Sequence, residues 1–374
     1  MSVSYIPDHV KTRLWGKAAG RCQYEGCNES LFYDALTKSE FNISYIAHIY
    51  ADSPQGPRFD PVYSPKLKAD ISNLMLLCDK HHRLIDRQEV KAHCVERLQR
   101  MKSDHEKRIS LISSVIPDRQ SHIVLFGANI GQQQVPLNFN EAANAIIPNK
   151  YPYSLNPIEL GLKNLVLEDH HSSYWLLQDE QVKEMFQREI VPIKHNHNVK
   201  HFSVFALAPI PLLVRLGSLF SDIYDVDVYQ RHREPCCWNW QNDESQIEFI
   251  IKIPRTFDGI PVLKLSLSAS ISDDRVIQEF QERCSIWEVS IPTPHNDFLR
   301  SRDMLSRFRT VLRKLLNEIK LKHGQNGVLH VFPAMPVATS VELGRVWMPK
   351  SDLPLQIYDQ NNKSQSFKPA IIIK

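Results

Sequence analysis

The sequence predicts an α/β protein of two domains, a small N-terminal domain over residues 1–115 and a larger C-terminal domain over residues 116–374. The chain of 374 residues is longer than one hydrophobic core normally holds. A proline and several polar residues interrupt the apolar pattern just after Val115. From Tyr151 onward, strand-like apolar runs alternate with helix-like runs, which is typical of α/β domains.

Composition narrows the class of protein. Hydrophobic residues make up 43% of the chain and charged residues 23%, as in globular proteins. The sequence contains no run of eighteen apolar residues, and its first residues lack the pattern of a signal peptide. We therefore expect a cytoplasmic protein with no membrane partner. The seven cysteines are an odd number, which favours metal ligands or free thiols over a disulfide framework.

The small positive charge is concentrated at one end of the chain. The formal net charge is +3, and residues 1–115 hold 17 Lys and Arg against 14 Asp and Glu, so the rest of the chain is balanced. This distribution fits a polyanion as the partner of the N-terminal domain.

Two helices are expected in the N-terminal domain. Residues Pro7–Ala19 have apolar side chains at every fourth position, and Gly20 can end the helix. Residues 87–109 carry an apolar stripe that includes Leu98 and Met101, with basic residues elsewhere. These basic residues either form a solvated face or contact DNA.

Two pairs of metal-ligating residues stand far apart in the N-terminal domain. Cys22 and Cys27 enclose a turn at Gly26, and Cys78 is followed three residues later by His81. Three sulfurs and one imidazole make four ligands, the number that a structural Zn²⁺ requires. The alternative is four unrelated buried residues.

A histidine, an asparagine and a second histidine lie between and beside these pairs. His48 ends an apolar run, Asn73 precedes a second apolar run, and His82 follows it. With the flanking strings AHI, GPR and NLMLLC, this order resembles the HNH nuclease family. The resemblance implies a zinc-stabilised ββα-metal fold that cleaves double-stranded DNA. Without the resemblance, His48 alone would be taken for a core histidine.

The resemblance also implies roles for these residues. His48 would be the general base, because imidazole titrates near neutral pH. His82 would ligate a catalytic Mg²⁺, which Mn²⁺ can replace, and Asn73 would either join it or hold the loop in place. Ala47 stands where many members carry a metal-binding aspartate, so Asp52 or water is expected to complete the coordination. Arg58 would hold a phosphate, unless it is an ordinary surface arginine.

The C-terminal domain begins with an apolar segment and contains an internal repeat. Residues 121–139 predict two strands around an Asn-Ile-Gly turn. Residues Phe202–Phe220 and Val328–Trp347 each predict a strand, a proline-bearing turn and a helix, with Gly217 and Gly344 at matching places. The repeat predicts two Rossmann-like halves.

The strings FALAPIPLLVRLG, VDVYQRHREPCCWNW, LSLSAS and HVFPAMPVATSVELGRVWMPK resemble the SAVED domain, and the resemblance covers most of residues 118–374. It implies two CARF-like halves that sense a cyclic di- or trinucleotide. An HNH nuclease joined to SAVED resembles the DNA-degrading effectors of CBASS anti-phage systems.

A cyclic nucleotide requires aromatic faces, cations and backbone N–H groups. In a doubly wound sheet such ligands bind beyond the carboxyl ends of the strands. The expected contacts are Arg231, Arg233, Trp238, Trp240, Pro209, Lys264, Ser266, Ala334 and Met335. Either tryptophan could instead belong to the core.

Three functions are compatible with these patterns. The first is a ligand-gated DNase that assembles into a homo-oligomer when the cyclic nucleotide binds. The second is a restriction-type HNH enzyme whose C-terminal domain reads DNA, although the neutral charge of that domain argues against it. The third is a non-catalytic zinc module with a sensor, although zinc binding requires neither His48 nor Asn73.

Overall fold

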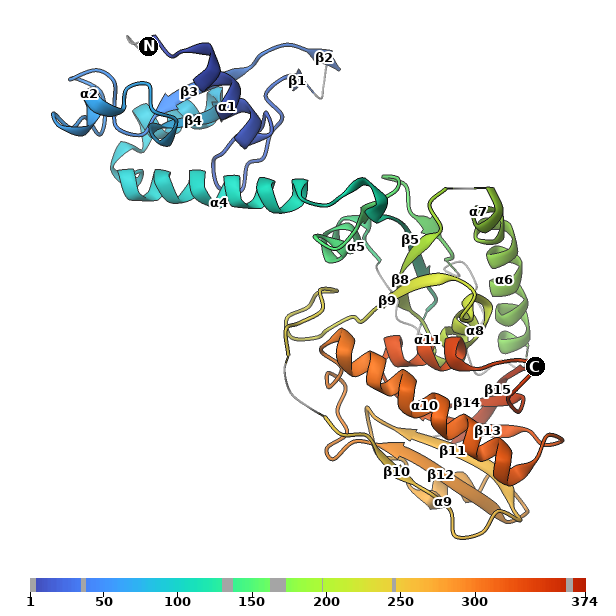
Figure 1. The fold of residues 1–374 in the computed structure, drawn as a ribbon. Helices are drawn as coiled ribbons and strands as arrows, with labels where there is room; N and C mark the ends of the chain where they lie inside the picture. The colour runs from blue at the N-terminus through green and yellow to red at the C-terminus, as the bar shows by residue number, and fades with distance from the viewer. Residues whose placement is uncertain are drawn as a thin grey trace. The chain divides into compact units, whose positions relative to one another are not determined.

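The computed structural model describes residues 5–34, 38–129, 137–161, 173–196, 198–243, 247–360 and 366–374. The chain divides into two compact units, Met1–Ile116 and Pro117–Lys374, and each has its own hydrophobic core. Figure 1 shows the helices and strands of both units. Among the described residues, no helix is both long enough and apolar enough to cross a bilayer.

The N-terminal unit is built around one antiparallel pair of strands, β3 (Ser44–His48) and β4 (Leu74–Cys78), in which His48 faces Leu74. A short helix, α3, follows β4 directly, so the strand pair is followed by a helix, while α2 and a 3₁₀ turn lie in the connection between the two strands. The remaining elements are α1 (Asp8–Ala18), β1 (Tyr33–Asp34), β2 (Ser39–Glu40), α2 (Tyr63–Leu67), a 3₁₀ turn (Ile71–Asn73), α3 (Asp79–Arg83), a π-helical turn (Leu84–Gln88), a second 3₁₀ turn (Val90–Ala92) and α4 (Val95–Ser113).

The core of this unit lies between α1, β4 and α4. The structure confirms the first predicted helix, whose Val10, Leu14 and Ala18 are buried. Leu98 and Met101 of α4 join the same cluster. Burial of each such side chain contributes about 1.5–3 kcal/mol.

The second predicted helix has different bounds, because α4 begins at Val95 rather than near residue 87. The intervening segment is held by His93, which is buried and is hydrogen-bonded through Nδ1 to the carbonyl of Glu89 (2.7 Å) and through Nε2 to the hydroxyl of Tyr24 (3.0 Å). These tertiary contacts separate the π-helical turn from α4, which periodicity alone could not reveal.

The C-terminal unit contains two sheets. The first has parallel strands in the order β6-β5-β8-β9, with β7 also on β5, and the second has the order β10-β12-β11-β13-β14-β15, with antiparallel strands at both edges. The elements are a 3₁₀ turn (Pro117–Arg119), β5 (Gln120–Gly127), α5 (Phe139–Ile146), β6 (Tyr151–Pro152), β7 (Ile158–Glu159), α6 (Tyr174–Glu189), α7 (Val191–Asn196), β8 (His201–Leu207), α8 (Ile210–Phe220), β9 (Asp225–Tyr229), β10 (Ile250–Lys252), β11 (Ile260–Ser266), α9 (Asp273–Ile277), β12 (Cys284–Ser290), α10 (Arg302–His323), β13 (Leu329–Ala334), α11 (Val337–Val346), β14 (Leu355–Gln360) and β15 (Phe367–Ile373).

Each sheet is covered on both faces. Alternate residues of β11, such as Val262 and Leu263, enter two different clusters, because successive side chains of a strand point to opposite faces. One face of the second sheet packs on α10 and α11, and the other packs on Val276 of α9. The first sheet is covered in the same way: α6 and α8 pack on one face, and α5 packs on the other.

The structure confirms the predicted internal repeat. Pro209 precedes α8 and Pro336 precedes α11, each directly after a parallel strand. The two helices cross at Gly217 and Gly344 (Figure 1). A Cβ on Gly217 would lie 1.9 Å from the carbonyl oxygen of Val341, so any side chain at this crossing would force the helices apart.

Two segments of this unit, residues 121–139 and residues 230–243, carry expectations from the sequence. The second strand expected within residues 121–139 falls mainly on residues 130–136, which lie outside the described residues. The two arginines and two tryptophans expected to contact the ligand lie on a loop, residues 230–243, because β9 ends at Tyr229. Pro235 has no N–H for a ladder, and the N–H of His232 instead bonds to the carbonyl of Cys237 (2.9 Å).

Candidate functional site

The structure brings the four expected zinc ligands together. The ligand atoms of Cys22, Cys27, Cys78 and His81 all lie within 4.8 Å of one another. Nδ1 of His81 is 3.2 Å from Sγ of Cys78 and 3.7 Å from Sγ of Cys22. Three sulfurs and one imidazole nitrogen at these separations fit a tetrahedral Zn²⁺.

Local backbone geometry explains how the cluster forms. Cys78 ends β4 and His81 lies one turn into α3, so both ligands project from the same corner. On the other side, Gly26 has a φ of +77°, which lets the chain reverse between Cys22 and Cys27. Burial raises the pKa of the Cys22 and Cys78 thiols, and a bound cation is the natural way to hold them as thiolates.

Two residues that support this cluster, Tyr24 and His93, were not predicted from the sequence. The ring of Tyr24 stacks on His81, with centroids 4.1 Å apart and planes 3° from parallel. The hydroxyl of Tyr24 is hydrogen-bonded to His93, which lies just before α4. His81, Tyr24 and His93 therefore form one connected group. Burial lowers the pKa of His81, which keeps its imidazole neutral, the form that ligates metal.

His48, the candidate base, lies at the end of β3 and is nearly buried. Its Nε2 is 2.8 Å from the carbonyl oxygen of Lys68. Because a carbonyl oxygen only accepts hydrogen bonds, Nε2 donates in this contact, and Nδ1 is the ring nitrogen that remains for a water. The ring is therefore held in one tautomer, as a general base requires.

The hydrogen bonds of Asn73 fit the second of the two roles considered for it, that of holding the loop in place. Its buried Oδ1 accepts a hydrogen bond from the N–H of Tyr50 (2.7 Å), and its Nδ2 donates to the carbonyls of Tyr50 (3.1 Å) and Leu67 (3.3 Å). Asn73 thus ties the loop after β3 to the start of β4. Its role as a metal ligand stays a prediction, because an amide oxygen that accepts one hydrogen bond keeps a second lone pair.

His82 has a carboxylate beside it, that of Asp86, which was not among the predicted site residues. Nε2 of His82 lies 3.4 Å from Oδ2 of Asp86, and the imidazole stacks on Tyr45 with centroids 4.8 Å apart. Asp86 is one turn further along, on the π-helical turn, so the two side chains share a face. A spacing of four residues between two potential ligands was the signal that could have found it.

Arg58 is held by protein acceptors and is not the exposed surface arginine that was the alternative. Its side chain is 6% exposed, and Nη2 donates to Oδ1 of Asp86 (2.6 Å). Nε and Nη1 donate to the carbonyls of Ile49 (3.0 Å) and Ile85 (2.8 Å). The guanidinium therefore links the segment after His48 to Asp86, and its contact with a phosphate stays a prediction.

In the C-terminal unit, several residues lie where the expected ligand would bind. Pro209 and Ala334 lie at the carboxyl ends of the parallel strands β8 and β13, next to the first turns of α8 and α11. The side chain of Met335 is buried beside Ala334. The carbonyl of Ala334 accepts hydrogen bonds from the N–H groups of Leu267 (2.9 Å) and Ser268 (2.7 Å), which fixes the end of β11 against β13.

A sequence model of the SMODS-associated and fused to various effectors sensor domain, abbreviated SAVED, matches residues 182–373, just over half of the chain. The chain belongs to the SAVED family. No curated protein matches it in sequence.

Solved structures with a similar fold include the Acinetobacter baumannii Cap4 SAVED/CARF-domain containing receptor with the cyclic trinucleotide 2′3′3′-cAAA (11% identity, TM-score 0.45, 74% of this chain and 60% of that chain). The Moraxella osloensis Cap4 SAVED/CARF-domain containing receptor is also similar (10% identity, TM-score 0.38, 75% of this chain and 60% of that chain). The chain thus matches 60% of the length of each of these receptors.

Four of the residues expected to contact the ligand make contacts with other residues of the SAVED unit. Trp238 is 2% exposed and packs edge-on against Phe205, so its faces are covered. Lys264 and Ser266 are buried, and both contact Glu288. Trp240 packs partly against the core. The buried position of Trp238 fits the core role that was left open for either tryptophan, and the burial of Lys264 depends on its place in the sheet, which its residue type does not reveal.

The two arginines remain closer to the expected edge. Arg231 is partly exposed and pairs with Glu141 (2.6 Å). Arg233 is exposed, and its backbone N–H donates to Asp297 (3.2 Å), a residue that the sequence reasoning missed. Oε1 of Gln230 accepts a bond from the N–H of Ala338 (3.1 Å) in the first turn of α11. The loop after β9 is therefore anchored to the other half.

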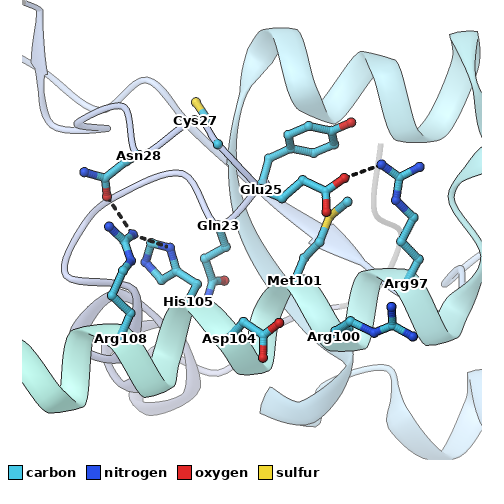
Figure 2. Close-up of a pocket in the computed structure, with 12 residues that line it drawn as sticks. Gln23, Glu25, Cys27, Asn28, Arg97, Arg100, Met101, Asp104, His105 and Arg108 are labelled. Carbon is cyan, nitrogen blue, oxygen red and sulfur yellow. Dashed lines mark hydrogen bonds and ion pairs between the residues drawn. The ribbon is translucent and has the colours of Figure 1, made fainter. Parts of the chain in front are cut away.

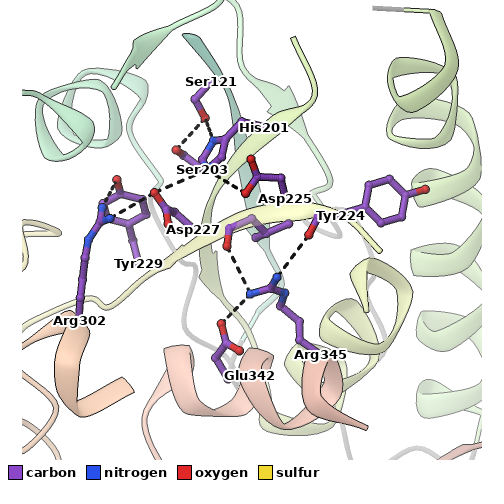
Figure 3. A network of polar contacts seen from close by, with 11 residues as sticks. Ser121, His201, Ser203, Tyr224, Asp225, Asp227, Tyr229, Arg302, Glu342 and Arg345 are labelled. Atoms are coloured by element: carbon purple, nitrogen blue, oxygen red, sulfur yellow. Dashed lines mark hydrogen bonds and ion pairs between the residues drawn. The ribbon is translucent and has the colours of Figure 1, made fainter. Parts of the chain in front are cut away.

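A polar network also joins the two halves of the SAVED unit (Figure 3). Glu342, fully buried on α11, accepts hydrogen bonds from Arg309 of α10 (2.8 and 2.9 Å) and Arg345 (2.8 Å). Arg345 reaches the carbonyls of Val226 and Tyr224 near the start of β9. Two guanidinium groups compensate the buried carboxylate, so loss of Glu342 would leave both without their partner.

His201 belongs to the same network and predicts a pH effect. Burial lowers its pKa to about 4, despite Asp227 at 3.6 Å. The unfolded chain, with a His pKa of about 6.5, takes up the proton first as the pH falls. The free energy of unfolding should therefore decrease from pH 6.5 toward 4, by about 2 kcal/mol at pH 5 from this group.

Urea unfolding at pH 7 and pH 5 checks this prediction. His201→Asn, which keeps a group near Nδ1 for the bond to Ser121, should lose less stability than the parent between these pH values. An equal loss in both proteins would show that His201 does not titrate as described.

Proposed function

We propose that the chain is a DNA endonuclease that a cyclic oligonucleotide activates through the SAVED unit. The observation that carries this proposal is the arrangement of the N-terminal unit, where His48 ends β3, and His82 and Asp86 lie on the helical segment after β4. Arg58 links Asp86 to the carbonyl of Ile49, next to His48, and the same segment contributes His81 to the Cys₃His cluster. This arrangement supplies candidates for the base and the metal ligands that an HNH nuclease needs. Membership of a sensor-domain family supports the regulatory half of the proposal.

In the proposed reaction, His48 removes a proton from the attacking water. Its Nδ1 is the acceptor, and the bond from Nε2 to the Lys68 carbonyl stabilises the imidazolium that forms. His82 and Asp86 would hold a divalent ion, Mg²⁺ or Mn²⁺, with Arg58 orienting Asp86. When bound, the ion supplies positive charge for the phosphate and the departing 3′ oxygen. Zn²⁺ in the Cys₃His cluster would serve the fold and not the reaction.

The SAVED unit is proposed to supply control. The strand ends at Pro209 and Ala334 lie beside the first turns of two helices, where backbone N–H groups favour phosphate. Partly exposed Arg231 and exposed Arg233 follow the carboxyl end of the parallel strand β9 and are the cations that we assign to the ligand. Moving an inactive population from 1% to 99% active requires about 5.5 kcal/mol of preference for the active state, which favours ligand binding coupled to self-association.

The decisive experiment incubates the full chain with plasmid DNA, Mg²⁺ and a panel of cyclic di- and trinucleotides. We expect DNA degradation with one class of ligand and little without it. Analytical ultracentrifugation of the same samples should show a larger species with that ligand. Degradation with every sample, ligand or not, would favour an unregulated enzyme of restriction type.

The control separates ligand sensing from cleavage. Arg233→Glu changes an exposed residue of the SAVED unit and leaves the N-terminal unit intact. If the pocket lies at the strand ends, this variant should need more ligand to reach the same cleavage rate. An unchanged ligand requirement would contradict the placement of the pocket, while the nuclease activity would still be established.

A further inference from the structure

A hollow of about 550 Å³ lies on the N-terminal unit, away from the residues assigned to the reaction. One wall is the loop Gln23–Asn28 around the Cys₃His cluster, and the other wall is one face of α4 (Figure 2). We name it the knuckle groove. The α4 residues that line it are Arg97, Arg100, Met101, Asp104, His105 and Arg108.

The knuckle groove carries more positive than negative charge. Its three arginines face two carboxylates, Glu25 and Asp104. Glu25 is already paired with Arg97. Burial lowers the pKa of His105, so this ring adds no charge near neutral pH. Arg100 makes no ion pair or hydrogen bond with any residue that the structure describes, so its guanidinium is available to a ligand.

A buried donor in the same groove lacks a partner. Gln23 is 1% exposed, and its Oε1 accepts a hydrogen bond from the N–H of Leu76 (2.8 Å). Its Nε2 is buried and has no acceptor among the described residues. Leaving such a donor unpaired costs about 1–3 kcal/mol, which a ligand oxygen would recover. The groove therefore presents donors and cations together, which is the chemistry that recognises an anionic oxygen.

We propose that the knuckle groove binds the phosphate backbone of duplex DNA and positions the substrate of the proposed nuclease, on which this inference rests. Arg97 and Arg108 are eleven residues apart, which corresponds to roughly 16 Å along α4. That length spans several charges of a duplex, which carries one per about 1.7 Å of its axis. The planar fork of arginine matches phosphate oxygens, whereas acidic peptides offer fewer charges per unit length.

The test measures DNA binding by the full chain with fluorescence anisotropy, using a short labelled duplex over a series of salt concentrations and no added Mg²⁺. Arg100→Gln removes a cation that has no partner in the fold. We expect it to weaken binding about tenfold and to reduce the slope of log K against log salt by about 0.9, the effect of one phosphate contact. Lys107→Gln, on the same helix but outside the groove lining, is the matched control and should leave the slope unchanged.

A second variant addresses the buried donor. Gln23→Glu keeps an oxygen that can accept from Leu76 and replaces the unpaired Nε2 with a second oxygen, which would repel phosphate. It should weaken DNA binding at least as much as Arg100→Gln, and thermal unfolding of each variant checks that the fold is retained.

Two outcomes overturn the inference, and they can be told apart. If the wild-type chain binds and cuts DNA but Arg100→Gln and Gln23→Glu bind as tightly as Lys107→Gln, the groove is not a DNA site and the proposed function stands. If the wild-type chain neither binds nor cuts DNA with any cyclic nucleotide, both proposals fail. Arg100-dependent binding of poly-glutamate but not of DNA would assign the groove to an acidic peptide.

Discussion

Replacing His48 with alanine should abolish DNA cleavage by the ligand-activated chain. A positioned general base contributes about 10²–10⁴-fold to the rate, and the nearly buried position of His48 leaves little room for a substitute water network. The fold should change little, because the lost bond to the Lys68 carbonyl contributes only about 1 kcal/mol. The measurement is the single-turnover rate on plasmid DNA at saturating Mg²⁺ and activator.

Two further variants make this result specific. His48→Gln keeps a side-chain N–H that can reach the Lys68 carbonyl but has no basic nitrogen, so it should be as inactive as His48→Ala. His9→Ala removes an exposed histidine of α1 and should cut at the parent rate. A His48→Gln rate close to that of the parent would remove His48 from the role of base.

Replacing Cys78 with serine should unfold the N-terminal unit and release its metal. In zinc-finger peptides, structural Zn²⁺ contributes about 10–16 kcal/mol, which is as large as the whole stability of an ordinary domain. Cys78 contacts both His81 and Cys22, so its loss opens the cluster at its centre. We expect less than stoichiometric zinc by elemental analysis and rapid proteolysis between residues 5 and 113.

Cys94→Ser is the control for this experiment. Cys94 belongs to the same unit, is exposed and lies outside the cluster, so its replacement should retain full zinc content and the melting temperature of the parent. The SAVED unit, which has its own core, should keep its unfolding transition in both variants. Stoichiometric zinc in Cys78→Ser would show that Cys78 is not a zinc ligand and that the metal is held by other residues.

The sequence predicted best those features that depend on neighbours along the chain. A single turn brings Cys22 close to Cys27, and another brings Cys78 close to His81. Each pair could therefore be predicted from its spacing in the sequence, and the structure then shows the two pairs together. The same holds for the strand, proline and helix of the repeat, because apolar periodicity and a proline turn are local signals.

Features that depend on tertiary packing could not be predicted in this way. The pairing of Arg58 with Asp86 joins residues 28 positions apart, and the arginine alone gave no sign of this partner. Trp238 looks like a stacking residue in the sequence, yet the fold covers it with Phe205. Where a side chain has two plausible environments, its type alone does not choose between them.

The crossing of α8 and α11 limits how the SAVED unit can respond to a ligand. At Gly217 and Gly344 the two backbones touch without intervening side chains, so no rotamer change can let one helix slide over the other. Both α8 and α11 begin at the strand ends where the ligand is expected. A displacement of the first turn of one helix should therefore also displace the other. The two halves should therefore move together as one body when a ligand binds at the strand ends, rather than shift one helix past the other.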